Sequence, residues 1–229
     1  MDQYGFKKIS ASETDRVFRR AHQKQLSPMT SEGCEIMKKF DIYITGVGGQ
    51  GIGLLSEALL RAVDHSGQRA IGADTHGLAQ RGGMVSSHLR IGSSVNSVLI
   101  MKHTADMVIA LERHEALRGI VDYLKEKGTL VYYDTVWQPL DVRLRKAREI
   151  KNEDIERESR KRDVRAIREL EEDLKDARMQ NVVLMGRIAR DGLIPGVSVD
   201  HYERSLSDLM DGDLLTKNLE LFRRLSRRE

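Results

Sequence analysis

Apolar residues along the chain follow two periods, one typical of strands and one typical of helices. Residues 41–45 have strand character and lead into a run of glycines, after which apolar residues recur at helical spacing from Ile52 to Val63. This pattern predicts a strand, a tight glycine turn and a helix. Further strands are predicted at 69–73, 84–91, 95–100, 105–111 and 129–133, and further helices at 112–127, 180–191, 199–210 and 213–226.

The order of these elements indicates the fold class. Strands that alternate with helices are typical of an α/β fold, and we expect a single doubly wound, mostly parallel sheet domain with C-terminal helices. The GSS sequence at 92–94 predicts a hairpin between its two flanking strands. Gly128 is placed to end the helix predicted at 112–127.

Residues 1–36 are polar and charged and differ from the rest of the chain. Their one weakly amphipathic stretch ends at Ser27 and Pro28. We therefore expect a peripheral, loosely held N-terminal extension rather than a docked helix. Met37, which follows it, is a candidate native start, and the predicted domain covers residues 37–229.

The stretch from Val142 to Arg178 is dominated by charged residues with few apolar ones. Its pattern predicts one or two exposed helices whose charges pair at a spacing of four residues. A solvated face is the simpler interpretation of this stretch, and a helix that binds a partner is the alternative.

Charge and composition argue against several classes of function. The chain has 229 residues, with 38 basic and 35 acidic side chains that leave a formal charge of +3, and only 5% aromatic residues. Charges that nearly cancel and scarce aromatic rings argue against nucleic-acid binding and against a membrane surface. No apolar run reaches the roughly 20 residues of a membrane span. The single cysteine, Cys34, fits a reducing, cytoplasmic setting.

The glycine turn is the first candidate site. Gly46, Gly48 and Gly51 form a G-x-G-x-x-G pattern between a strand and a helix, and Asp74 ends the next strand about 20 residues later. In dinucleotide-binding folds this arrangement places a pyrophosphate at the helix start and a ribose hydroxyl on the carboxylate. The alternative is that the glycines only allow the helix to pack closely on the sheet.

Three sequences together carry a resemblance to a known family. GVGGQG, then ADTHGLAQRGGMVSSHLRIG, then QNVVLMGRIARDGLIP resemble the gamma module of the 2-oxoacid:ferredoxin oxidoreductases, most closely the small (beta) subunit of indolepyruvate ferredoxin oxidoreductase. The resemblance covers about residues 37–225. It implies an α/β domain and a short strand near 164–167, where periodicity alone favours a helix.

The resemblance also implies a reaction. Complexes of this family oxidatively decarboxylate a 2-oxoacid to an acyl-coenzyme A and pass electrons to ferredoxin, using thiamine diphosphate, magnesium and iron–sulfur clusters. Clusters need several cysteine ligands, whereas Cys34 is alone, and no glycine-aspartate motif with a downstream asparagine is present to hold magnesium and a diphosphate. We therefore expect a larger partner subunit to carry these cofactors, with coenzyme A as co-substrate. This chain is then inactive by itself and provides no catalytic residue and no metal site.

The loop at 76–83 is the second candidate site. Ligands meet doubly wound sheets at the carboxyl ends of the strands, where this loop and the glycine turn are expected to lie side by side. Arg81 offers a donor pair for a carboxylate, a coenzyme A phosphate or an acidic group of the partner. The alternative is that Gln80 and Arg81 only fix the loop. His76 and His88 are interpreted as structural histidines.

The predicted binding surface therefore consists of residues from the turn and from the loop. They are Gly46, Gly48, Gly49, Gln50, Gly51, His76, Gln80, Arg81, Gly82 and Gly83. Two other functions remain open at this point: a stand-alone nicotinamide-dependent oxidoreductase that uses the turn and Asp74, and an accessory binding protein without a catalytic role.

Overall fold

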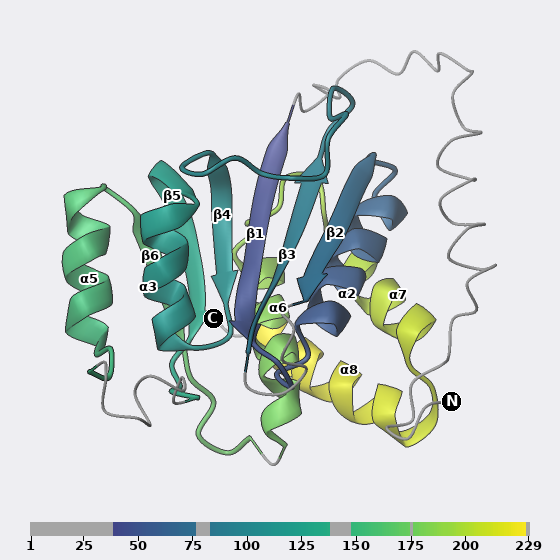
Figure 1. Ribbon diagram of the computed structural model, residues 1–229. Coiled ribbons are helices and arrows are strands. Elements are labelled where there is room, and N and C mark those ends of the chain that lie inside the picture. Colours follow the sequence, from purple (N-terminus) through teal and green to yellow (C-terminus); the bar gives the residue numbers. More distant parts are fainter. Residues whose placement is uncertain (1–38, 77–82, 138–147, 175, 228–229) are drawn as a thin grey trace.

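The computed structural model describes residues 39–76, 83–137, 148–174 and 176–227 (Figure 1). The predicted N-terminal extension and the site residues Gln80, Arg81 and Gly82 lie outside these ranges. Among the described residues, no helix has the length and apolar character needed to cross a membrane.

The centre of the molecule is one six-stranded sheet with the strand order β2-β3-β1-β4-β5-β6. β3 is antiparallel to its neighbours β1 and β2, and the remaining pairs β1–β4, β4–β5 and β5–β6 are parallel. The prediction of a mostly parallel sheet is confirmed. The strands are β1 (Phe40–Val47), β2 (Ala70–His76), β3 (Met84–Ile91), β4 (Ala105–Ala110), β5 (Leu124–Tyr133) and β6 (Arg165–Glu169).

Helices cover both faces of the sheet, as the doubly wound prediction requires (Figure 1). Side chains alternate along a strand, so that Ile42 and Ile44 of β1 join one core and Tyr43 joins the other. The first core is completed by α2 (Ile52–His65), α6 (Gln180–Arg190), α7 (Val199–Leu209) and α8 (Gly212–Ser226). The second is completed by α3 (Arg113–Asp122) and α5 (Asn152–Lys161), and a short 3₁₀ turn, η1 (Ala177–Met179), precedes α6.

The predicted strand at 95–100 is wrong, because this stretch is an irregular loop. Both edges of β3 are already paired, with β1 on one side and β2 on the other. No edge of β3 is left to pair with a strand at 95–100, so the predicted hairpin cannot form. The local sequence pattern does not show that both edges of β3 are occupied.

The helix predicted at 112–127 is too long. α3 ends at Asp122, and Leu124 begins β5. Leu124 is fully buried and pairs with Ala105 of β4. Pairing in the sheet therefore outweighs the helix propensity of the lysines and glutamates that follow.

The charged stretch after residue 148 forms both a helix and a strand. α5 confirms an exposed charged helix in which Glu158 pairs with Lys161 and Arg162. β6, at Arg165–Glu169, confirms the strand that the resemblance implied and that periodicity had assigned to a helix. Its residues are mostly exposed, because β6 is an edge strand with a single buried apolar side chain, Ile167.

Candidate functional site

The carboxyl ends of the five mutually parallel strands meet at one edge of the sheet, together with the start of β3. The end of the predicted loop and the glycine turn touch at this edge, where the Gly48 N–H donates to the Gly83 carbonyl oxygen at 2.9 Å. The expected side-by-side arrangement is therefore present for the described residues. His76 ends β2 at the same edge.

Two residues of the turn are enclosed by the chain itself. The Gln50 side chain is completely buried; its Oε1 accepts from the Val47 N–H at 2.8 Å and its Nε2 donates to the Leu111 carbonyl at 2.8 Å. A Cβ on Gly46 would lie 2.9 Å from that Oε1 and 3.1 Å from the Leu111 Cβ. Gly46 and Gln50 thus hold the turn between β1 and the end of β4.

The remaining glycines present backbone at the surface. Gly49 is exposed with φ 108°, and Gly51 is the partly exposed N-cap of α2 with φ 79°. Both angles lie in the left-handed region that favours glycine. The Trp137 ring lies 3.9 Å from the place of a Cβ on Gly49 and is 39% exposed, so that it forms a rim beside the turn.

Asp74 is placed differently from a ribose-binding carboxylate. β3 is inserted between β1 and β2, which moves Asp74 one strand further from the turn. Its Oδ1 accepts from the Ser87 hydroxyl at 2.5 Å, and Ser87 is 2.6 Å from the Ser56 hydroxyl of α2. Asp74 therefore ties β2 to β3 and α2.

His88 has a structural environment, as its sequence context indicated. Its Nδ1 accepts from the Ile100 N–H at 3.1 Å, and its ring packs against that of Tyr43 with centroids 5.1 Å apart. Burial, assisted by the nearby Arg90 charge, lowers the pKa of His88, which keeps the ring neutral.

Acidic residues after β4 belong to this edge and were missed by sequence reasoning. Glu112 is fully buried, caps α3 and accepts from the Glu115 N–H at 2.5 Å. Glu115 is 3% exposed and accepts from the Thr45 hydroxyl at 2.9 Å. Burial raises the pKa of Glu115 against the opposing effects of the Arg118 charge and the Thr45 hydroxyl.

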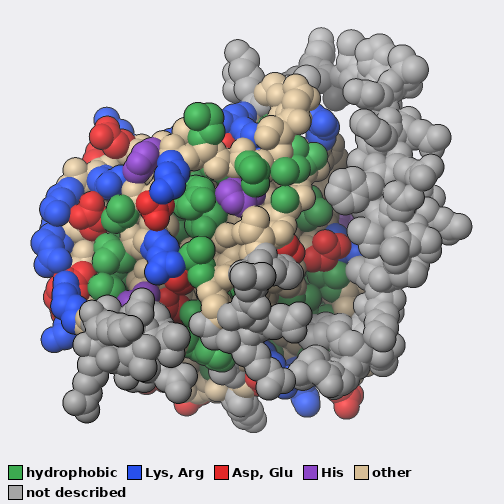
Figure 2. Space-filling view, in the orientation of Figure 1, with side chains coloured by type: hydrophobic (Ala, Val, Ile, Leu, Met, Phe, Trp, Pro, Cys, Tyr) green, Lys and Arg blue, Asp and Glu red, His purple; other side chains and the backbone are tan. Residues whose placement is uncertain are grey.

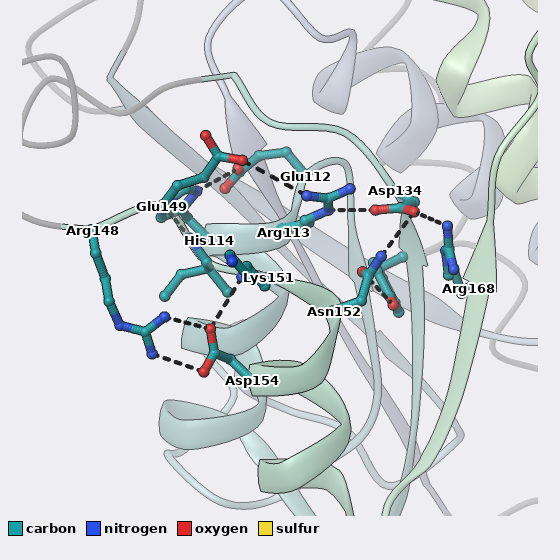
Figure 3. A network of polar contacts seen from close by, with 12 residues as sticks. Glu112, Arg113, His114, Asp134, Arg148, Glu149, Lys151, Asn152, Asp154 and Arg168 are labelled. Atoms are coloured by element: carbon teal, nitrogen blue, oxygen red, sulfur yellow. Dashed lines mark hydrogen bonds and ion pairs between the residues drawn. The ribbon is translucent and has the colours of Figure 1, made fainter.

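His114 connects this acidic pair to the segment before α5 (Figure 3). Its Nε2 accepts from the Ile150 N–H at 3.2 Å, so its Nδ1, 3.1 Å from Glu112, carries the proton and donates. His114 therefore links Glu112 at the start of α3 to the segment before α5.

Asp134, just after β5, joins four elements (Figure 3). It binds Arg113 of α3, Asn152 of α5 at 3.0 Å and Arg168 of β6 at 2.5 Å. Burial acts to raise the pKa of Asp134, but hydrogen bonds from Arg113 and Asn152 outweigh it, so the pKa lies below its usual 3.8. Their position in the sequence was the available signal, because Asp134 directly follows β5 and Glu112 comes two residues after the end of β4.

The polar side chains of Glu112, His114 and Asp134 are already bound to neighbouring groups of the chain through hydrogen bonds and ion pairs. This end of the sheet is therefore suited to binding rather than to nucleophilic chemistry. Across the ranges that the structure describes, no three histidine, cysteine or acidic residues are grouped as metal ligands. Accessible groups beside the glycine turn include the backbone at Gly48 and Gly49 and the Trp137 ring.

Comparison with known proteins identifies relatives over nearly the whole described chain. Residues 41–226 match the family described as pyruvate ferredoxin/flavodoxin oxidoreductase. The indolepyruvate oxidoreductase subunit IorB of Archaeoglobus fulgidus is 35% identical over 189 residues, covering 80% of this chain and 91% of that protein. The IorB subunit of Thermococcus kodakarensis is 41% identical over 96 residues, covering 42% and 46%.

Solved structures share the fold at low sequence identity. The pyruvate oxidoreductase subunit PORC of Thermotoga maritima has a TM-score of 0.58 and 18% identity, covering 84% of this chain and 97% of that one. The keto/oxoacid ferredoxin oxidoreductase gamma subunit of Geobacter sulfurreducens has a TM-score of 0.53 and 20% identity, covering 82% and 96%. The 2-oxoglutarate:ferredoxin oxidoreductase of Magnetococcus marinus has a TM-score of 0.57 and 19% identity, covering 82% of this chain and 30% of that one.

The resemblance read from the glycine turn and the THGLAQRGG sequence is thereby confirmed. The structure has the mostly parallel sheet and the glycine turn that the sequence predicted, and the family match covers residues 41–226. This chain belongs to the pyruvate ferredoxin/flavodoxin oxidoreductase family.

Proposed function

We propose that this chain is the small subunit of an indolepyruvate-type 2-oxoacid:ferredoxin oxidoreductase. The complex would oxidatively decarboxylate an aryl 2-oxoacid to its acyl-coenzyme A and reduce ferredoxin. The observation that carries this proposal is the 35% identity to an IorB subunit that is matched over 91% of its length.

Thiamine diphosphate, magnesium and the iron–sulfur clusters are assigned to a larger partner subunit. A cluster needs several thiolates, and the one cysteine of this chain does not fit that requirement. No electron-transfer step is therefore assigned to this chain. A cytoplasmic setting fits the same cysteine usage.

The role proposed for the chain is to complete the active site through its carboxyl-end edge. Gly48, Gly49 and Gly51 bring backbone close to a bound group, while Gly46 and Gln50 hold the turn in place. The loop residues His76, Gln80, Arg81, Gly82 and Gly83 would contact coenzyme A or the partner subunit.

Reconstitution tests the function directly. The chain is co-purified with the larger subunit encoded in the same organism, and coenzyme A-dependent reduction of ferredoxin is measured with indolepyruvate. Activity is expected from the complex and from neither subunit alone. Decarboxylation with dye reduction by the isolated chain, or tight NADH binding that Asp74→Asn abolishes, would contradict the proposal.

The loop is tested in the same complex with Arg81→Ala. We expect either the KM for coenzyme A or the Kd for the larger subunit to rise about tenfold, the loss of one charged hydrogen bond. If both constants stay unchanged, Arg81 has only a local role in the loop.

A further inference from the structure

The loop between β3 and β4, residues 92–104, is fixed in place although it has no regular structure. The Arg90 Nη1 donates to the carbonyls of Ser97 at 2.7 Å and Leu99 at 3.2 Å. Arg69 donates to two further carbonyls nearer the start of the loop, at 2.7 and 3.2 Å. Arg90 of β3 and Arg69, which directly precedes β2, thus replace the hydrogen bonds that a strand partner would supply.

The second half of the loop is fixed as well. The Ile100 N–H donates to His88, and the His103 N–H donates to the Asp122 carbonyl at the end of α3 at 3.1 Å. The Thr104 hydroxyl donates to the Met101 carbonyl at 2.9 Å. The loop is therefore held against both the sheet and α3.

This fixed loop turns apolar side chains toward solvent. Leu99 is 56% and Met101 is 76% exposed, whereas Ile100 between them is buried. Of the seven exposed large apolar side chains among the described residues, four lie here and form what we call the loop patch: Val98, Leu99, Met101 and, at the end of α3, Val121. Hydrophobic side chains reach the surface on this face in Figure 2.

Basic residues surround the loop patch. Lys102 is 65% and Lys125 is 46% exposed, and each pairs with one carboxylate. Lys39 and Arg90 share a single, fully buried carboxylate, that of Asp41. In the contacts described for it, the exposed Arg69 binds carbonyl groups and no carboxylate. The basic side chains around the loop patch therefore outnumber the carboxylates that pair with them. A complementary surface would be apolar at its centre and acidic at its rim.

We propose that the loop patch is the docking surface for the larger partner subunit, a role that rests on the proposed function. Because its backbone is already fixed by hydrogen bonds, the loop loses little backbone entropy on binding, and apolar side chains removed from water are typical of the centre of an interface. The same fold also occurs inside a longer chain, where it covers only 30% of the length.

The position of the loop patch suits this role. Ile91, after which the loop begins, pairs with Phe40 at the amino end of β1, so the loop lies at the edge opposite the glycine turn (Figure 1). Docking here leaves the carboxyl-end edge accessible to coenzyme A.

Substitutions in the chain, measured against the larger subunit by titration calorimetry, test the surface. Met101→Asp and Leu99→Asp are expected to raise the Kd about 30-fold or more, the effect of losing a central interface residue. Leu170→Asp is the matched control, since Leu170 is 42% exposed at the end of β6, away from the loop patch, and should leave the Kd within about twofold. Thermal unfolding of each isolated variant verifies that it is folded.

The outcomes separate the two proposals. If the unmodified chain does not bind the larger subunit, the proposed function fails. If it binds and Met101→Asp binds equally well, only the docking surface is overturned. Lys102→Glu is expected to weaken binding of the larger subunit about tenfold. Tighter binding would contradict the proposal that the partner's surface is acidic at its rim. If Met101→Asp instead abolishes a homodimer of the isolated chain without changing the complex, the occupant is a second copy.

Discussion

At the scale of single residues, Gln50 fills one of the variable positions of the glycine motif yet points inward. Its amide joins the Val47 N–H to the Leu111 carbonyl across the ends of two parallel strands. A ligand at the turn would therefore meet backbone groups rather than this side chain.

Gln50→Ala is expected to lower the free energy of unfolding by about 2–4 kcal/mol, because it removes two buried hydrogen bonds and leaves a cavity. Urea denaturation measures the change, with exposed Asn96→Ala as a control that should shift it by less than about 0.5 kcal/mol. Unchanged stability combined with lost coenzyme A or partner binding would assign the amide to a ligand instead.

Two glycines at the start of α2 should respond in opposite ways to the same substitution. Gly51 has φ 79°, and a Cβ there would lie 2.9 Å from the Asn181 Nδ2, so Gly51→Ala is expected to cost at least about 1 kcal/mol. Gly53 lies within the helix, and among the residues that the structure describes a Cβ there would meet only Asp74 Oδ2, at 3.8 Å. Gly53→Ala should therefore stabilise by about 0.5–1 kcal/mol. Thermal unfolding of both variants checks the contrast, which equal shifts would contradict.

Glu115 gives the stability a dependence on pH. Its pKa is raised in the folded state from the usual 4.5, mainly by burial. Between 4.5 and the raised value the folded chain binds more protons than the unfolded chain, so stability falls as the pH rises through this window. Glu115→Gln, which keeps an acceptor for Thr45, should be more stable than the unmodified chain at pH 7, and the gain should disappear near pH 4.5. Denaturation curves at both pH values measure it, and a less stable variant at pH 7 would refute the assignment.

At the scale of elements, Asp134 connects α3, α5 and β6 to the end of β5 (Figure 3). Its folded pKa is lowered, so its contribution to stability is present above its usual 3.8 and is lost as the pH falls through the folded value. The carboxylate therefore fixes the second helical layer at neutral pH.

Asp134→Asn is expected to lower the free energy of unfolding by about 2 kcal/mol at pH 7, below the value for a fully buried pair because Arg168 is half exposed. The two proteins should converge in stability at pH values below 3.8. Glu156→Gln, at an exposed site paired with Arg160, is the control and should change stability little. A difference that persists unchanged into acid would contradict the role of the charge.

Local signals predicted the elements whose partners are close in sequence. The glycine turn, α2 and the C-terminal helices follow from periodicity and capping. The contact between Gly83 and Gly48 was predicted instead from the general rule that loops meet at the carboxyl ends of the strands in a doubly wound sheet. The irregular loop at 92–104 and the strand at 124–128 depend on which edge of which strand is free. That information lies in distant pairing and not in local pattern.

The residues of the candidate site also divide into those that the sequence reveals and those that only the assembled fold reveals. Gly49 and Gly51 are visible in sequence because their backbone angles favour glycine, and Gly46 because a Cβ there would clash. Glu112, Glu115 and Asp134 are ordinary surface-type residues in a linear reading, and they become buried partners only when β4, β5 and α3 are assembled. The strand β6 was found through family resemblance, since its charged sequence lacks a strand period.

At the scale of the whole molecule, the two sheet edges have separate tasks in our proposals. The carboxyl ends carry the glycine turn and the network of acids, and the amino ends carry the loop patch. A substitution in the loop patch should then weaken assembly without changing the carboxyl-end surface that we assign to the active site.

A chain comprising residues 37–229 is expected to unfold within about 2 °C of the full chain, because the family match begins only at residue 41 and the sequence before Met37 is polar. Thermal unfolding followed by circular dichroism measures this difference. A drop of 10 °C or more, about 3–5 kcal/mol for a chain of this size, would show that residues 1–36 form part of the folded domain.

The inserted β3 has a consequence for how this fold can diversify. Because β3 runs back along β2, both ends of the connection at 77–82 leave the sheet at neighbouring positions, His76 and Val85 being paired across the two stems. The pairing of the two stems does not depend on the side chains of the connection, so substitutions there can change what the fold binds while the sheet stays intact. The THGLAQRGG sequence that carries the family resemblance runs through this connection, so we expect such substitutions to affect binding that the family shares.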